Sequence, residues 1–352
     1  MKTTDILIIG AGQSGLALGY QLHKRRYRFL LVDAAPRVGD NWRNRYDSLV
    51  LFTTNELSSL PDLPIPGDPE SYTSRKDFGD YLEAYARYFE MPVELNTRIQ
   101  KLERVNDEFC ATSTDGRVYQ ARVVVVANGP YQKPFVLDFS KNLSNEVLQF
   151  TAATYKNASQ IPAGSVVVVV GNGSTGRDMA ADLSAANTVY LATGKFRLLL
   201  PERVFGIPPG TLLTKLGVLT APSESFIARA FRNLDPFPDR EGNVRAMRKK
   251  GIRIMPRLIG LQGNTATFAN GASVSVNAVL WAVGYKDDSW DWIQIPEAKD
   301  EQGNIVHRHG ISPVRNLYFL GRPWQTSRMS TLIFGAKKDA ELIAMEIDGV
   351  LV

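Results

Sequence analysis

The sequence predicts an α/β protein built from two Rossmann-like domains, with the second domain inserted in the first. A buried strand, a glycine-rich turn, a helix and a second strand follow one another from residue 5, and the same pattern begins again at residue 165. Short runs of β-branched residues are typical of parallel strands that are covered on both faces. Each unit of this kind binds a dinucleotide, so two units imply two dinucleotides.

The first unit comprises a strand at 5–10, a helix at 16–26 and a strand at 29–33. In the turn between them, Gly10 permits a tight bend, Gly12 lets the backbone approach a pyrophosphate, and Gly15 lets the helix pack closely on the strand. The helix N-terminus offers free N–H groups to phosphates. Asp33 ends the second strand, where a carboxylate can bind ribose hydroxyls.

The second unit has strands at 165–170 and 188–192, with a helix at 178–186 and the turn Gly171-Asn172-Gly173-Ser174-Thr175-Gly176. No acidic residue ends its second strand, which runs into Thr193. A missing carboxylate disfavours a strict NAD site and leaves room for a 2′-phosphate. Lys195 and Arg197 can supply the charge for that phosphate, or they are solvated surface residues. The choice between NADPH and NADH stays open.

The remaining segments are less regular. Residues 41–69 are rich in Pro, Asn, Asp and Ser and predict a long loop, which is commonly functional. A helix is expected at 74–91, with Thr73 or Ser74 as its N-cap. Residues 206–250 are interpreted as irregular, and we expect them to shape substrate entry. Further elements are strands at 117–127, 252–261, 265–268, 278–283 and 317–320, and a final helix at 331–347.

Composition excludes several classes of function. The single cysteine, Cys110, cannot form a disulfide, a CxxC redox pair or a zinc cluster, and no histidine has a metal-ligand partner. The net charge of +5 is spread along the chain, which favours solvated surface over a nucleic-acid patch. No apolar run reaches the ~20 residues of a membrane span. We expect a cytoplasmic protein without stable membrane insertion, and a homodimer is compatible with the sequence.

The loop after Asp33 carries a family resemblance. Gly39-Asp40-Asn41-Trp42, the segment 46–66 and the motifs at 72–75 and 81–86 resemble class B flavin-containing monooxygenases, especially single-chain bacterial and plant auxin-forming members. An aspartate, Asp40, stands at the second glycine of the family motif. The resemblance implies FAD on the first unit, NADPH or NADH on the second, and transfer of one oxygen atom from a flavin C4a-(hydro)peroxide. Molecular oxygen and a small organic molecule would be the substrates.

The resemblance also assigns cofactor-binding residues. Ala127-Asn128-Gly129 and the segment around Gly284 resemble the hinge motifs of the family. A helix that begins near Ser330 would present its amides to the flavin. The cofactor residues are Gly10, Gly12, Gln13, Ser14, Gly15, Asp33, Ala34, Gly39, Asn41, Trp42, Thr53, Thr54, Ile99, Ala127, Asn128, Gly129, Gly171, Gly173, Ser174, Thr175, Gly176, Thr193, Lys195, Arg197, Gly284, Gly321, Ser330, Thr331 and Leu332.

The catalytic candidate is Asn55, since a loop asparagine stabilises the oxygenated flavin in several relatives; a turn-forming asparagine is the alternative. The histidine of the family fingerprint is replaced by Thr151. That departure keeps a second function open, an NAD(P)H oxidoreductase or oxidase without productive oxygenation, and a non-catalytic nucleotide-binding module is the third. The expected domains are 1–160 with 286–352 for FAD, and 161–285 for NAD(P)H.

Overall fold

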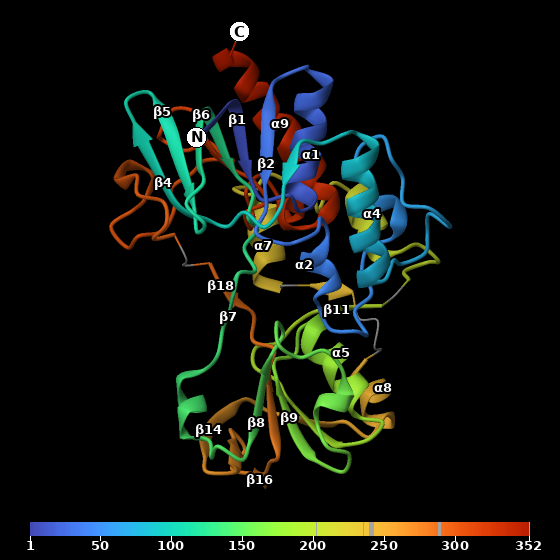
Figure 1. The fold of residues 1–352 in the computed structure, drawn as a ribbon. Coiled ribbons are helices and arrows are strands. Elements are labelled where there is room, and N and C mark those ends of the chain that lie inside the picture. Colours follow the sequence, from blue (N-terminus) through green and yellow to red (C-terminus); the bar gives the residue numbers. More distant parts are fainter. Residues whose placement is uncertain (202, 235, 239–242, 288–289, 352) are drawn as a thin grey trace.

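The computed structural model describes residues 1–201, 203–234, 236–238, 243–287 and 290–351. Two units, each with a mainly parallel sheet flanked by helices, lie end to end and are joined by two extended segments (Figure 1). The first strand and the last helix of the chain belong to the same unit, so the other unit is an insertion. This arrangement confirms the predicted fold class.

The first unit is built on a sheet with the strand order β3-β2-β1-β6-β5-β4, and β19 pairs with β6. Alternate residues of β1 enter different cores: Ile6 and Ile8 pack with helices α1 and α9, whereas Leu7 and Ile9 pack on the opposite face. The elements of this unit are β1 (Lys2–Ile9), α1 (Gln13–Lys24), β2 (Phe29–Val32), α2 (Asp40–Arg43), α3 (Asn55–Ser58), α4 (Arg75–Tyr88), β3 (Val93–Glu94), β4 (Ile99–Val105), β5 (Glu108–Ser113), β6 (Val118–Val126), β19 (Leu317–Phe319) and α9 (Ile333–Leu351).

The second unit contains a five-stranded parallel sheet of order β13-β10-β9-β17-β8 and a separate antiparallel sheet, β14-β15-β16. Strand β8 pairs with β17, so this part of the predicted 1–160 segment contributes to the second sheet. The elements are β8 (Leu148–Thr151), β9 (Val166–Val170), α5 (Ser174–Leu183), β10 (Thr188–Ala192), α8 (Val244–Lys249), β13 (Arg253–Met255), β14 (Leu258–Gln262), β15 (Thr265–Phe268), β16 (Ser273–Ser275) and β17 (Ala278–Trp281).

The chain crosses between the units twice, and the two crossings pair with each other. β7 (Lys133–Pro134) runs antiparallel to β18 (Tyr285–Lys286), with Pro134 opposite Tyr285. Figure 1 shows this pair as the link between the upper and lower units. Both crossings follow a buried strand end, β6 or β17, and each therefore passes the mouth of its own parallel sheet.

Several sequence predictions are confirmed in detail and others are wrong. Strand β10 has the predicted bounds, and Ser74 caps α4 by accepting a hydrogen bond from the Asp77 N–H. Residues 206–250 are not irregular: they contain α6 (Pro209–Lys215), α7 (Phe226–Leu234) and α8, although positions 235 and 239–242 lie outside the described residues. Short strands β11 (Leu199–Leu200) and β12 (Phe237–Pro238) flank α6 and α7. No helix in the described ranges is long and apolar enough to cross a membrane.

Candidate cofactor and active site

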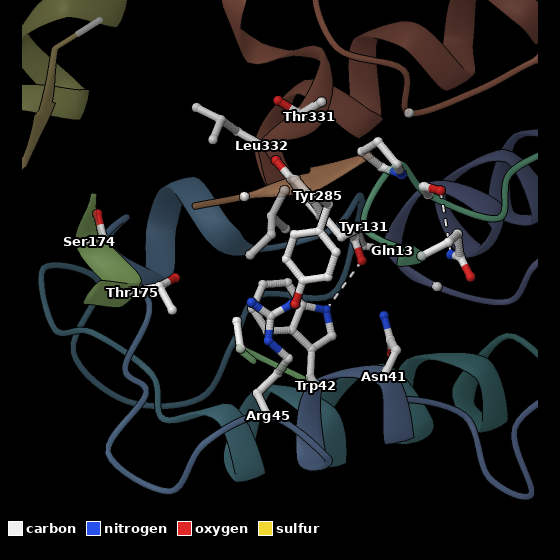
Figure 2. Close-up of a pocket in the computed structure, with 18 of the residues that line it drawn as sticks. Gln13, Asn41, Trp42, Arg45, Tyr131, Ser174, Thr175, Tyr285, Thr331 and Leu332 are labelled. Atoms are coloured by element: carbon white, nitrogen blue, oxygen red, sulfur yellow. Dashed lines mark hydrogen bonds between the residues drawn. The ribbon is translucent and has the colours of Figure 1, made fainter. Parts of the chain in front are cut away.

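A large cavity of about 1340 Å³ lies between the two units. Both glycine turns open into it, together with both crossing segments and the loop that follows β2. Figure 2 shows side chains from both units around this cavity, with Gln13 and Trp42 from the first and Ser174 and Thr175 from the second. Seven arginine and lysine residues line the cavity against three aspartates, so it suits anionic ligands.

The glycines of the first turn have two different roles: some allow close packing of the backbone, and one leaves space for a ligand. A Cβ on Gly15 would lie 1.9 Å from the Gly10 carbonyl oxygen, so Gly15 is required for helix α1 to follow β1 closely. Gly10 has φ of +114° and packs on the Ala127 carbonyl. A Cβ on Gly12 would meet only the Asn41 side chain, at 3.6 Å, and Gly12 lines the cavity. Gly12 therefore leaves space that a phosphate can occupy.

Asp33 is fixed by the backbone around it. Its Oδ2 accepts a hydrogen bond of 2.6 Å from the Ala11 N–H, and its Oδ1 accepts one of 2.8 Å from the Ala35 N–H. These bonds tie the end of β2 to the first glycine turn. Asp33 also lines the cavity, as do Ala34 and Ile99, so the carboxylate is held at the position expected for a ribose contact.

The loop after β2 forms one wall of the cavity. Trp42 donates a hydrogen bond of 3.2 Å from Nε1 to Gln13 Oε1, and its ring packs edge-on against Phe78 (Figure 2). Asp40, which replaces a family glycine, accepts a hydrogen bond of 3.0 Å from the buried Arg43 guanidinium. Gly39 lines no part of the cavity: with φ of +86°, its backbone touches Gly79, and a Cβ would lie 2.2 Å from the Gly79 oxygen.

The second turn repeats the geometry of the first. A Cβ on Gly176 would lie 2.0 Å from the Gly171 carbonyl oxygen, whereas a Cβ on Gly173 would meet no atom within 4 Å. Gly173 lines the cavity, and the N-terminal residues of α5, Ser174 and Thr175, lie beside it. The second unit thus also provides a helix N-terminus next to space for a phosphate.

Of the residues that follow β10, one makes a structural hydrogen bond and three line the cavity. Thr193 does not line the cavity and instead donates a hydrogen bond of 2.9 Å from Oγ1 to the Met255 carbonyl. Gly194, Lys195 and Arg197 do line it. The cationic side chains near the end of this strand therefore reach the same cavity as the second glycine turn.

The C-terminal end of the cavity is built differently from the prediction. Residues Arg328–Thr331 form a 3-10 turn, and α9 begins only at Ile333. Ser330 is nearly fully buried and accepts hydrogen bonds from the N–H groups of Thr326 and Ser327, so it closes the turn and does not cap α9. Ser330, Thr331 and Leu332 nevertheless line the cavity, as does Gly321, whose φ is +77°.

The catalytic candidate Asn55 is not brought to the cavity. Its Nδ2 donates to the Asp68 carbonyl at 3.0 Å, and its Oδ1 accepts from the Thr73 hydroxyl at 2.5 Å. Both ends of the amide therefore hold the 55–73 loop, which is the turn-forming alternative. Thr53 lines the cavity, whereas the nearly fully buried Thr54 does not.

Thr151, at the place of the family histidine, is also structural. It ends β8, and its hydroxyl accepts a hydrogen bond of 3.3 Å from the Ala153 N–H and lies 3.3 Å from the Thr154 hydroxyl. These contacts stabilise the turn that follows β8. Thr151 does not line the cavity, although the next residue, Ala152, does.

Sequence reasoning missed a group of cavity residues with long side chains. Arg45, Tyr131 and Tyr285 surround the centre of the cavity in Figure 2. The Tyr131 and Tyr285 ring centroids are 5.4 Å apart, and the Arg45 guanidinium carbon lies 5.8 Å from the Tyr285 centroid. Both tyrosines adjoin the crossing strands, and no periodicity in the sequence marks them.

Within the described residues, no group of His, Cys, Asp and Glu side chains could hold a metal ion. Cys110 lies in β5 and is not among the cavity residues. The two glycine turns, the fixed Asp33 carboxylate and the aromatic wall fit a flavin dinucleotide on the first unit and a pyridine dinucleotide on the second. The fold and the site define a two-dinucleotide oxidoreductase.

Comparisons with known proteins extend this class. Residues 7–198 match the family model described as pyridine nucleotide-disulphide oxidoreductase. An uncharacterized oxidoreductase, CzcO-like, of Geobacillus kaustophilus is 40% identical over 97% of this chain and 98% of its own. The probable indole-3-pyruvate monooxygenase YUCCA8 of Arabidopsis thaliana is 27% identical over 98% of this chain and 88% of its own. A flavin-containing monooxygenase from Stenotrophomonas maltophilia has the same fold, with a TM-score of 0.81, 21% identity and full coverage of both chains.

The chain belongs to the pyridine nucleotide-disulphide oxidoreductase family, and its fold is that of the flavin-containing monooxygenase. It is an FAD-dependent oxidoreductase that uses NAD(P)H. The name of the family does not imply dithiol chemistry in this chain, because the chain has one cysteine and a dithiol pair needs two.

Proposed function

We propose that the chain oxidises NAD(P)H with its bound FAD and transfers one atom of molecular oxygen to a small organic substrate. The observation that carries the proposal is the shared cavity: Gly12 and Gly173, the middle glycines of the two turns, both line it and leave space beside the backbone. Ligands on the two turns would therefore approach each other inside one cavity. Bound FAD supplies hydride acceptance and oxygen activation, and the protein supplies position and charge.

On the first unit, the backbone around Gly12 and the α1 N-terminus would hold the pyrophosphate, and Asp33 the ribose. Trp42, anchored to Gln13, would fix the flavin ring from one side. Residues 330–332, ahead of α9, would place peptide groups and the positive end of the α9 dipole at the other side, where they stabilise added negative charge.

On the second unit, the N-terminus of α5 beside Gly173 would hold the nucleotide pyrophosphate. Lys195 and Arg197 would bind a 2′-phosphate, which favours NADPH over NADH. We place the boundaries of this nucleotide domain at the β7 and β18 crossings, because β8 already pairs within its sheet.

The substrate would enter between the crossings and the α6–α7 region. Apolar side chains from this region line the cavity, including Leu213, Leu219 and Phe231. They would exclude water from the reacting atoms and favour an apolar substrate. The prediction that residues 206–250 shape entry is consistent with these lining positions.

A second function, NAD(P)H oxidation that ends in hydrogen peroxide, is favoured by one observation. Asn55, the catalytic candidate, and Thr151, which stands at the fingerprint histidine of the family, both make hydrogen bonds that stabilise local turns. With these side chains engaged elsewhere, the chain would not shield reduced FAD, and the chemistry that FAD supplies would then end in hydrogen peroxide.

One experiment separates these functions and the non-catalytic alternative. Purified, FAD-loaded protein is first mixed with NADPH without oxygen, and bleaching of the flavin absorbance shows hydride transfer. The reduced protein is then given ¹⁸O₂ with a panel of sulfides, ketones and keto acids. Incorporation of ¹⁸O into product with little peroxide supports the monooxygenase. Stoichiometric peroxide without labelled product would refute oxygenation, and absence of bleaching would refute the enzyme.

A further inference from the structure

Arg45 occupies an unusual position in the cavity. It lies in the loop between α2 and α3, lines the cavity, and makes no side-chain hydrogen bond or ion pair with any described residue. Its Nε is shielded from solvent and has no acceptor among them. Burying an N–H group without an acceptor is costly, so the shielded Nε of Arg45 fits a residue that binds an anionic ligand in the cavity.

The loop that carries Arg45 is fastened to the second unit on both sides of it. Tyr46 donates a hydrogen bond of 2.8 Å to Asp178 of α5. The Asp47 N–H donates to the Lys156 carbonyl at 2.7 Å, and Asn157 donates to the Asp47 carboxylate at 2.6 Å. Lys156 also bonds the Asn44 carbonyl. Arg45 thus belongs to the first unit by sequence but is held against the second.

Three positively charged side chains meet at the joint between the two units, where Asp47 and Asp178 also lie. Arg45, Arg75 and Lys156 meet there, and Arg75 is paired with Asp47. Burial, and then the charge of Arg75, lowers the pKa of Lys156, and Arg45 adds to this effect although Asp47 opposes it. The N-terminus of α5 contributes a further partial positive charge on the same side of the cavity. An anion at this point would relieve the repulsion.

We propose that Arg45 binds the pyrophosphate of the pyridine nucleotide seated on the second glycine turn. This inference rests on the proposed function. Figure 2 shows Arg45 between Trp42 and the residues Ser174 and Thr175 of that turn. The fork of a guanidinium can contact two phosphate oxygens at once. The nucleotide site is then completed across the domain boundary.

The test is the affinity of FAD-loaded protein for NADP⁺ and NAD⁺, followed by calorimetry or by perturbation of the flavin spectrum. Loss of a charge-assisted hydrogen bond predicts about 10- to 100-fold weaker binding in Arg45→Met. Because both nucleotides carry the pyrophosphate, both should lose affinity by the same factor. Arg45→Lys should recover part of the loss, since it keeps the charge without the fork.

The control is Arg232→Met. Arg232 also lies over an aromatic ring, 4.4 Å from the Trp324 centroid, but it is exposed and does not line the cavity. This variant should bind both nucleotides as the parent does. Flavin content and melting temperature verify that each variant is folded.

Three outcomes would overturn the inference. One is an Arg45→Met protein that is folded and flavin-loaded and binds NADP⁺ within about twofold of the parent. Another is a loss confined to NADP⁺, which would assign Arg45 to the 2′-phosphate. The third is an unchanged nucleotide affinity with loss of product formation, which would assign it to the substrate. If the parent itself bound neither nucleotide, the proposed function would fail, which is a distinguishable result.

Discussion

The phenol of Tyr46 and the carboxylate of Asp178 join the two units through a hydrogen bond of 2.8 Å. Tyr46 comes from the loop that also forms the flavin wall, and Asp178 lies in the first turns of α5, next to the second glycine turn. Burial, and then the negative charge of Asp178, raises the pKa of Tyr46 far above its usual range, so the phenol stays a donor at all working pH values.

Tyr46→Phe should therefore weaken the contact between the two units without removing a residue that binds either dinucleotide. A hydrogen bond to a charged acceptor contributes about 1.5–3 kcal/mol, which lowers the melting temperature by a few degrees in a chain of this size. Anaerobic flavin reduction by NADPH should slow, because the nucleotide turn is no longer held against the flavin wall. Stopped-flow absorbance measures that rate.

Tyr27→Phe is the matched control, because it also removes a phenol-to-carboxylate bond. Tyr27 donates to Asp348 at 3.1 Å, between the start of β2 and α9 and away from the joint. It should reduce stability without changing the rate of flavin reduction. Equal reduction rates in the two variants would argue against a role of Tyr46 in domain coupling.

Substitutions at two glycines of the second turn, Gly173 and Gly176, should cause two different kinds of defect. Gly173→Val adds a side chain where no atom lies within 4 Å, so the protein should fold and retain FAD, but the side chain enters the phosphate space and nucleotide binding should be lost. Gly176→Ala would place a Cβ 2.0 Å from the Gly171 oxygen, so it should destabilise the second unit instead. Thermal melting and NADP⁺ titration distinguish the two defects. A stable Gly173→Val protein with unchanged NADP⁺ affinity would remove that glycine from the site.

Asp33 should control flavin retention. Asp33→Asn keeps the size of the side chain but can accept only one of the two backbone N–H groups, from Ala11 and Ala35, that the carboxylate now accepts. We expect about 10- to 100-fold weaker FAD binding, from a loss of 1.5–3 kcal/mol. Flavin-to-protein absorbance ratios and reconstitution of the apoprotein measure it. Asp5→Asn, which breaks only the exposed pair with Arg28, should keep its full flavin content.

The sequence predicted those parts of the site that backbone geometry dictates, and it failed where tertiary contacts direct a side chain. Gly12 and Gly173 could be found because only glycine leaves room for a phosphate at that turn. Asn55 lies in a loop that resembles a catalytic loop, but its amide is oriented by Asp68 and Thr73, which are 13 and 18 residues away. Arg45 could not be found, because its position depends on contacts with the second unit.

In the fold, too, some elements could be predicted from the sequence and others could not. Strand β9 could be predicted because its run of valines, buried at all but the first position, is decisive. Helices α6 and α7 were missed, since the surrounding Pro and Gly residues and the short lengths of these helices obscure their periodicity. The hairpin β4–β5 was also missed: its alternating strands mix charged and apolar residues, and it is stabilised by the pairing of β5 with β6.

Protonation of His307 should contribute to the pH dependence of the stability of the protein. Burial, then the charges of Arg322 and His309, lowers its pKa below the usual 6.5. The Gly310 N–H also donates a hydrogen bond of 3.3 Å to Nδ1, which requires that nitrogen to be unprotonated. The folded protein therefore resists protonation, whereas the unfolded chain takes up a proton near pH 6.5. The contribution of neutral His307 to stability is therefore complete above pH 6.5 and is lost as the pH falls through the lower pKa of the folded state.

Replacement His307→Gln should accordingly flatten the fall in melting temperature between about pH 8 and about pH 5, because glutamine keeps an acceptor for Gly310 but does not titrate. His23→Gln, an exposed position in α1, should leave the parent profile unchanged. Melting temperatures across this pH range, at constant ionic strength, provide the measurement. If the His307 variant lost stability toward acid as steeply as the parent, the acid sensitivity would have to come from other groups.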